Sequence, residues 1–217
     1  MKKRFGKPMA SWVGAGLALL SSTQALSSPV ISELYYDAVG SDAGLVFLEL
    51  VGAPGSSLAG LVIEAINGTG GSVYKSVELS GAFPADGVFV IGDDDAGTTA
   101  VPDADLLADV DLQNGPDSVV LRDGTTVLDA LGYGEFSAGD VFAGEGTPAP
   151  AVPAGASLAR FNPFLDSGDN GADFVMLDTP TPGVVPEASP VPLPASALLF
   201  GSGILSLLVS RRSAKGI

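Results

Sequence analysis

Short runs of β-branched, aromatic and other apolar residues alternate with Gly, Pro, Asp and Asn through the middle of this 217-residue chain. Such runs are typical of β-strands, and the residues between them favour turns. Strands are expected at residues 30–36, 45–51, 61–66, 73–79, 88–91, 118–121 and 126–131, with weaker ones at 157–161 and 174–177. A repeat of roughly 10 to 15 residues favours an all-β, antiparallel sandwich over alternating strands and helices.

Two short segments add detail to this pattern. Asp123-Gly124 lies between the apolar runs 119–121 and 127–128 and predicts a hairpin, because Gly readily adopts the positive φ that a tight turn requires. Residues 103–112 form the one stretch that predicts a short helical turn.

Glu49 interrupts the apolar strand 45–51. Alternation places it on the same face as Phe47 and Val51, unless a bulge changes the phase of the strand. A carboxylate in such surroundings needs a backbone amide or a cation as partner, and Arg122 and Arg160 are the candidate cations. We interpret Glu49 as a structural acceptor that holds a loop, in preference to a catalytic acid.

The first 25 residues are typical of a signal peptide. A basic start is followed by the apolar stretch 12–20, which is too short to span a bilayer, and Thr23 and Ala25 place small residues at the −3 and −1 positions. The pattern predicts a signal helix that is cleaved after Ala25 by signal peptidase, with Ser27 as the alternative.

The last residues carry a three-part tail: a proline-bracketed motif, a charge-free apolar stretch over 195–210 and a basic end. The 16 residues of this stretch are fewer than the roughly 20 that a comfortable transmembrane helix needs. The positive-inside rule keeps the basic end, with Arg211 and Arg212 as membrane-anchoring residues, in the cytoplasm. The motif consists of Val191, Pro192, Leu193, Pro194 and Ala195. The tail resembles the VPLPA variant of PEP-CTERM sorting signals, which implies processing by an exosortase-type enzyme; the alternative is an ordinary single-pass anchor.

Removal of both ends changes the charge of the chain. Of its ten basic residues, only Lys75, Arg122 and Arg160 lie between the signal peptide and the tail, whereas all 25 acidic residues lie there. The exported part therefore carries a net charge of −22. Such a surface repels phosphate backbones and argues against nucleic acid as a partner, while it attracts divalent cations or basic proteins.

The sequence contains no Cys and no His. Their absence excludes disulfides, Ser-His-Asp triads, HExxH zinc sites and thiol nucleophiles. A glycosidase needs two carboxylates at a defined separation, and nothing in the sequence sets one. We expect a protein that is not an enzyme and needs no cofactor, with a hydrolase as a distant third hypothesis.

Two groups of Asp residues are weak candidates for a Ca²⁺ site, because Ca²⁺ prefers oxygen ligands. Neither follows the EF-hand spacing, and Asp commonly begins turns and caps strands. The sequence leaves both interpretations open. The candidates are Asp93, Asp94, Asp95, Asp166, Asp169 and Asp173.

An ordered set of short motifs covers nearly all of residues 30–183. The chain begins with Ile31-Ser32-Glu33-Leu34-Tyr35-Tyr36 and Val46-Phe47-Leu48-Glu49-Leu50, and continues through Val127-Leu128-Asp129 to Ser157-Leu158-Ala159-Arg160. It closes with acidic residues 166–173, Phe174 and Thr179-Pro180-Thr181-Pro182-Gly183. The set resembles the lamin-tail domain, although Leu61 stands where that family usually has Trp. The resemblance implies an immunoglobulin-like β-sandwich that acts as a binding or adaptor module.

These observations predict four segments: a signal peptide (1–25), a lamin-tail-like sandwich (26–183), a Pro-rich linker with the sorting motif (184–194) and a transmembrane segment with a basic tail (195–217). The expected function is structural or adhesive, at the cell surface or in the extracellular matrix, after a transient stage in the inner membrane. An exopolysaccharide or a surface protein is the expected partner. The alternative is a Ca²⁺-dependent carbohydrate- or protein-binding module.

Overall fold

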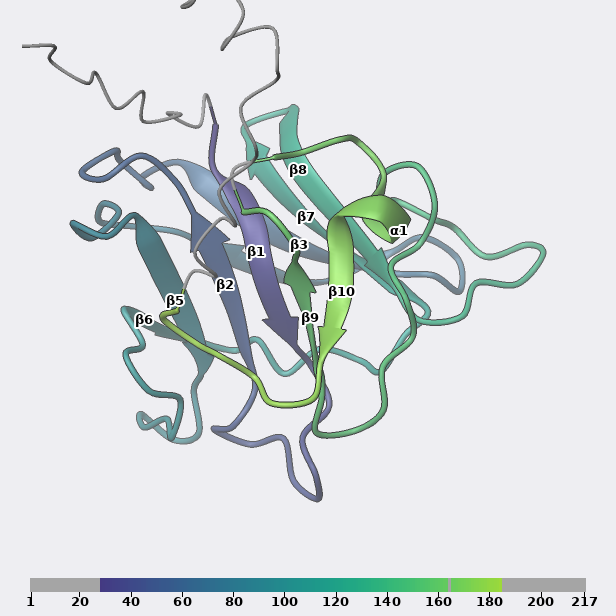
Figure 1. Ribbon diagram of the computed structural model, residues 1–217, viewed down its shortest axis with the longest axis horizontal. Helices are drawn as coiled ribbons and strands as arrows, with labels where there is room; N and C mark the ends of the chain where they lie inside the picture. Colours follow the sequence, from purple (N-terminus) through teal and green to yellow (C-terminus); the bar gives the residue numbers. More distant parts are fainter. Residues whose placement is uncertain (1–27, 164, 185–217) are drawn as a thin grey trace, which may run out of the picture.

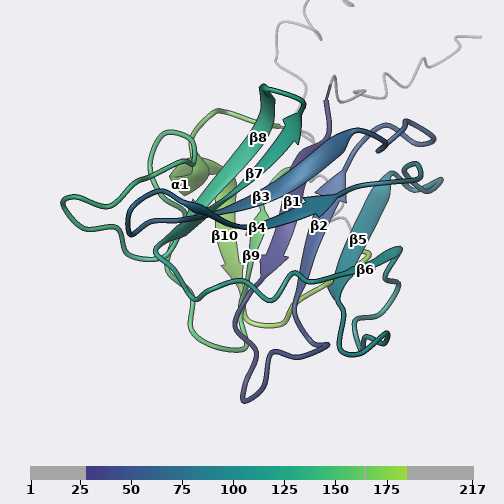
Figure 2. The same cartoon turned by 180° about the vertical axis from the view of Figure 1, so that it is seen from behind.

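The computed structural model describes residues 28–163 and 165–184, which form two β-sheets packed face to face (Figure 1). The six-stranded sheet has the order β10-β9-β1-β2-β5-β6, and the four-stranded sheet has the order β4-β3-β7-β8, seen from behind in Figure 2. The elements are β1 (Val30–Tyr35), β2 (Phe47–Val51), β3 (Leu61–Asn67), β4 (Val73–Glu78), β5 (Val88–Asp93), β6 (Leu106–Ala108), β7 (Asp117–Asp123), β8 (Thr126–Tyr133), β9 (Ser157–Arg160), α1 (Asn170–Asp173) and β10 (Phe174–Leu177).

The all-β prediction is confirmed, and each of the nine expected runs contains a strand. The hairpin at Asp123-Gly124 is also confirmed: Asp123 pairs with Thr126, and Gly124 has a φ of +56°.

The helical turn predicted over residues 103–112 is wrong. Strand β6 lies there instead and runs parallel to β5, so the sandwich is not entirely antiparallel. Every second residue of this segment contributes to the core: Leu106, Ala108, Val110 and Leu112. Two of the three intervening residues are Asp109 and Asp111, and because Asp is uncommon in strands this alternation was hard to recognise as a strand signal.

The main core lies between the two sheets. Strands β2 and β5 supply Leu48, Leu50 and Ile91 from one side, and β7 and β8 supply Leu121 and Leu131 from the other; all five side chains are fully buried. At roughly 1.5 to 3 kcal/mol for each large apolar side chain removed from water, this layer drives the sheets together.

The outer faces of both sheets are also covered. Phe47, Val88 and Val90 pack against Val101 from the loop that precedes β6. On the four-stranded sheet, the Phe142 ring lies so close to Gly132 that a Cβ atom there would come within 2.1 Å of it. Loop residues therefore cover the outer face of each sheet.

The free edge of β8 is covered by the Asn170 side chain and by the N–H of Ala149, which donates to the Gly132 carbonyl at 2.9 Å. Asn170 in α1 accepts a hydrogen bond from Gly132 N–H at 2.9 Å and donates one to the Ala130 carbonyl at 2.8 Å. Its amide thus replaces the next strand, which protects an edge that would otherwise invite pairing with another chain.

The predicted signal peptide, sorting motif and membrane-spanning tail lie outside the described residues. Within residues 28–163 and 165–184, no helix is both long and apolar enough to cross a bilayer.

Candidate functional site

Arg160 is the only fully buried cation among the described residues. It lies at the end of β9 and faces the gap between the sheets, where its side chain has no solvent exposure. Asp129 on β8 receives hydrogen bonds from Nη2 at 2.9 and 2.8 Å, and Asp173 in α1 receives one from Nη1 at 2.8 Å. The guanidinium also lies 4.7 Å from the centre of the Phe174 ring. One cation thus joins β9, β8 and α1.

The same cluster completes the hydrogen bonding of β1. The N–H of Ile31 donates to Asp129 Oδ2 at 2.6 Å, and Arg160 Nε donates to the Ile31 carbonyl at 3.0 Å. Strand β9 pairs with β1 only at Glu33 and Leu34, so two side chains continue the ladder where the backbone of β9 has ended. Buried peptide groups need such partners.

Further carboxylates surround this arginine. Asp166 lies 3.5 Å from Arg160 Nη1, and oxygens of Asp129, Glu145 and Asp166 all lie within 4.8 Å of one another. Burial raises the pKa of Glu145 to about 7, and the charges of Asp129 and Asp166 add to the rise. Burial likewise raises the pKa of Asp129, and Arg160 opposes that rise. This is the one acidic group among the described residues that is compact enough to share an ion, and Arg160 already supplies it with a cation.

A second polar cluster lies on the outer face of the six-stranded sheet. The register of β1 and β2 shifts between Ile31 and Glu33, so Ser32 forms a β-bulge and Glu33 lies directly opposite Glu49. Opposed residues point to the same face, and both glutamates are almost completely buried.

These two glutamates hold the C-terminal strap, residues 178–184. Glu33 accepts hydrogen bonds from the backbone N–H and the hydroxyl of Thr181, at 2.9 and 2.7 Å. Glu49 accepts the N–H of Gly183 at 2.8 Å. The strap thus crosses the sheet from β10 towards β5, as the yellow-green segment in Figure 1 shows. The Ser157 hydroxyl also donates to Glu33 Oε1, at 2.6 Å, and the Ser32 hydroxyl donates to Glu49 Oε1, at 2.7 Å.

The partner predicted for Glu49 is therefore half right. It is a backbone amide and not a cation: Arg160 bonds to Asp129 and Asp173, and Arg122 pairs with Glu64 at 2.5 Å on the four-stranded sheet. With no cation beside it, burial raises the pKa of Glu49 to about 7.

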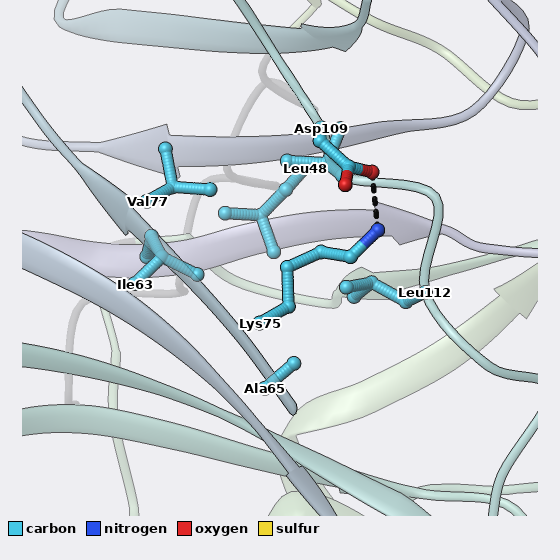
Figure 3. Close-up of a pocket in the computed structure, with 8 residues that line it drawn as sticks. Leu48, Ile63, Ala65, Lys75, Val77, Asp109 and Leu112 are labelled. Carbon is cyan, nitrogen blue, oxygen red and sulfur yellow. Dashed lines mark hydrogen bonds and ion pairs between the residues drawn. The ribbon is translucent and has the colours of Figure 1, made fainter. Parts of the chain in front are cut away.

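The third cation of the described residues closes a small pocket between the sheets (Figure 3). The stem of Lys75 lies along the apolar side chains of Leu48, Val77 and Leu112, and its ammonium group pairs with Asp109. It also donates to the Asp111 carbonyl at 2.6 Å. The pocket offers apolar walls and one ion pair, whose carboxylate is largely exposed.

The Asp residues considered for Ca²⁺ do not gather in one place. Asp93 is buried and accepts the N–H groups of Gly44 and Val110, while Asp94 accepts that of Gly97 and Asp95 forms an isolated bridge with Thr98. Asp94 and Asp95 thus make turn contacts, whereas Asp93 joins β5 to two segments that are distant in the sequence.

The second Asp group divides between two roles. Asp169 caps α1 by accepting Gly171 N–H and also binds Thr147. Asp166 and Asp173 face Arg160 instead. Of the six candidates, only Asp166 belongs to the compact acidic group; its other members, Asp129 and Glu145, could not be recognised in the sequence because they lie 16 or more residues away from any other member of the group.

The predicted processing residues, Ala25 and the motif 191–195, lie outside the described residues, as do Arg211 and Arg212. Neither a comparison with known protein families nor one with curated protein sequences gives a match for this chain.

We predict that Arg160→Met lowers the free energy of unfolding by about 3–5 kcal/mol at pH 7, because it leaves Asp129 and Asp173 buried without a cation. Arg122→Met is the matched control; its pair with Glu64 is partly exposed, and we expect a loss of less than about 1 kcal/mol. Urea unfolding of the full chain measures both. Equal losses would contradict the central role of Arg160.

We also predict that Glu49 makes the protein less stable as the pH rises. Because the folded state holds the Glu49 proton with a raised pKa, the free energy of unfolding falls between pH 4.5 and about 7 and then levels off. Glu49→Gln can accept from Gly183 and donate to Ser32 Oγ without a charge. We expect it to exceed the wild type by about 2–3 kcal/mol at pH 8 and by little at pH 4.5.

The control for this pH experiment is Glu64→Gln, which removes a carboxylate from a partly exposed ion pair. Urea unfolding of the full chain across pH 4.5 to 8 compares the three proteins. Parallel pH curves for the wild type and Glu49→Gln would show that burial does not shift this titration.

Proposed function

We propose that the chain is a non-enzymatic, lamin-tail-like sandwich of the immunoglobulin type, exported and displayed at the cell surface or in the extracellular matrix. Its role is structural or adhesive. An exosortase-type enzyme would process the tail at the motif 191–195, after a stage in which the segment from Ala195 holds the chain in the membrane.

The observation that carries this proposal is the way in which the motif residues contact one another. Glu33 and Glu49, from the first two motifs, bind Thr181 and Gly183 of the last one across as many as 148 residues of sequence. Asp129 and Arg160 come from two further motifs and form the buried ion pair. The motifs that carry the resemblance thus form one interlocking set of structural contacts, which favours a scaffold over a catalytic site.

The strap supports the idea of display. It ties the end of the domain to β1 and β2, so the segment that continues into the proposed sorting signal leaves from a fixed point on the outer face of the sheet. The motif begins at Val191, seven residues after Val184. At about 3.3–3.6 Å per residue, this distance is at most about 25 Å, so a processed chain would keep its domain close to whatever holds its new end.

One observation favours the alternative, a Ca²⁺-dependent carbohydrate- or protein-binding module: the three carboxylates of Asp129, Glu145 and Asp166. Against it, both oxygens of Asp129 already accept hydrogen bonds from Arg160, and a divalent ion would lie beside that guanidinium. We therefore retain the structural role as the main proposal.

We predict that Pro192→Ala combined with Pro194→Ala leaves the chain unprocessed and in the membrane fraction, because the extended recognition segment is lost. Immunoblots of cells that contain an exosortase-type enzyme measure the length and location of the chain. The control is Pro186→Ala with Pro190→Ala, which alters the same Pro-rich linker outside the motif and should be processed normally. Normal processing of the first variant would contradict the sorting proposal.

We predict that Ca²⁺ does not stabilise the protein. A site filled at 100 times its Kd would add about 2.7 kcal/mol and raise the Tm by several degrees. We expect the Tm to differ by less than about 1 °C between 5 mM Ca²⁺ and EDTA, with Mg²⁺ as the ionic-strength control. This Ca²⁺ concentration exceeds the Kd of weak extracellular sites, about 10⁻⁴–10⁻³ M. A rise of several degrees that Asp166→Asn abolishes would favour the Ca²⁺-dependent alternative.

A further inference from the structure

Strand β10 forms one edge of the six-stranded sheet and differs from the protected edge at β8. It pairs with β9 on one side only, through the register Phe174 with Arg160 to Leu177 with Ser157. Whereas Asn170 covers the backbone of β8, no side chain among the described residues forms a hydrogen bond with the backbone of residues 175–177.

The hydrogen-bond pattern fixes which groups of β10 point outwards. The N–H of Phe161 donates to the Asp173 carbonyl at 2.7 Å, which places these two residues at a hydrogen-bonded position of the ladder, and such positions alternate from there. The backbone N–H and carbonyl groups of Val175 and Leu177 then point towards β9, whereas those of Met176 point away from the sheet. The outward N–H of Phe174 is already used by the Asn170 carbonyl in α1. The free groups are those with which an added strand would pair.

Apolar side chains gather at this edge. Val175 is 38 % exposed and Met176 is 45 % exposed, on opposite faces of the strand, and Phe161, just beyond the end of β9, is 70 % exposed. Leu165 adds a further exposed side chain in the next turn. An edge strand with exposed apolar residues and free backbone groups is a template for pairing, and it carries no lysine or proline that would prevent it.

Charge decides what can occupy the edge. Between residues 28 and 184 the chain has three basic residues against 24 acidic ones, and all three basic residues are held in ion pairs. Asp166 and Asp178, both exposed, lie on either side of the β10 segment in the sequence. Edge-to-edge pairing of two copies would bring two strongly acidic surfaces together, whereas a basic strand would be attracted.

We propose that the edge of β10 is the docking site for an extended, basic segment of a partner protein, which adds to the six-stranded sheet as a seventh strand. Backbone pairing with Met176 supplies the alignment, the exposed apolar side chains supply contact area, and the acidic surroundings select Lys and Arg in the partner. The inference deepens the adhesive role proposed above and rests on it, but it does not depend on how the tail is processed.

The test uses the full-length chain and a fluorescent nine-residue peptide of alternating Lys and Val, with binding followed by fluorescence anisotropy. A second peptide has the same sequence with N-methyl groups on alternate amides, which keeps its charge but prevents strand pairing. Val175→Lys is the blocking variant, and Val127→Lys, which changes a similarly exposed strand valine on β8, is its control. Met176→Pro removes the outward N–H, a change that edge strands tolerate.

We expect Val175→Lys, Met176→Pro and N-methylation each to weaken binding at least tenfold, and Val127→Lys to weaken it less than twofold. Equal effects of the two lysine variants, or equal binding of the two peptides, would overturn the proposal in favour of adsorption to the acidic surface. Dimerisation that Val175→Lys abolishes would overturn it in favour of a second copy. If Met176→Pro unfolds the chain, the two lysine variants still decide. Loss of tail processing with intact peptide binding would count against the proposed sorting and not against this site.

Discussion

The packing of the two sheets depends on the contacts of the buried Arg160 guanidinium. Its two sheets meet at β9 and β8, which belong to different sheets, and the ion pair with Asp129 joins them there. The same two side chains supply the missing ladder partners of Ile31. A burial of this kind is expensive, and replacement by apolar residues is often no less stable in proteins. The charge provides specificity here. The N–H donors of the arginine have a fixed geometry and fit one arrangement of β1, β8 and α1, whereas an apolar side chain would be compatible with several.

The chain has very few cations for its many carboxylates, and this scarcity organises the rest of the polar interior. Arg160 is used where two sheets must be joined. At the Glu33–Glu49 pair, where no cation is present, hydroxyl and backbone N–H donors hold the carboxyl groups instead. Such neutral donors compensate burial less completely than a guanidinium does, which explains why the pKa of Glu49 rises to about 7. The acidic composition therefore affects the interior as well as the surface.

The strands could be predicted from the sequence because their signals are local: each run of apolar residues ends at a turn residue. The contacts that define the candidate sites could not, because they depend on register. A bulge at Ser32 brings Glu33 opposite Glu49, and neither that bulge nor the fact that Gly183 would be the donor is visible in the spacing of the residues. Strand β6 was missed for a different reason: the alternation that begins in it, with Leu106, Ala108, Val110 and Leu112, contains two aspartates, a residue type that is uncommon in strands. The two loops that cover the outer faces also left no periodic signal.

The contact between Glu33 and Thr181 spans 148 residues, nearly the whole domain, and it has a consequence for the order in which the chain can fold. Contacts that are distant in sequence close large loops and slow the search for the native state. Strand β1 is made first, but the residues that cover its outer face are made last. A chain that crosses a membrane N-terminus first would therefore emerge without its final contacts. In the export that we propose, the contacts of the strap would be the last to form.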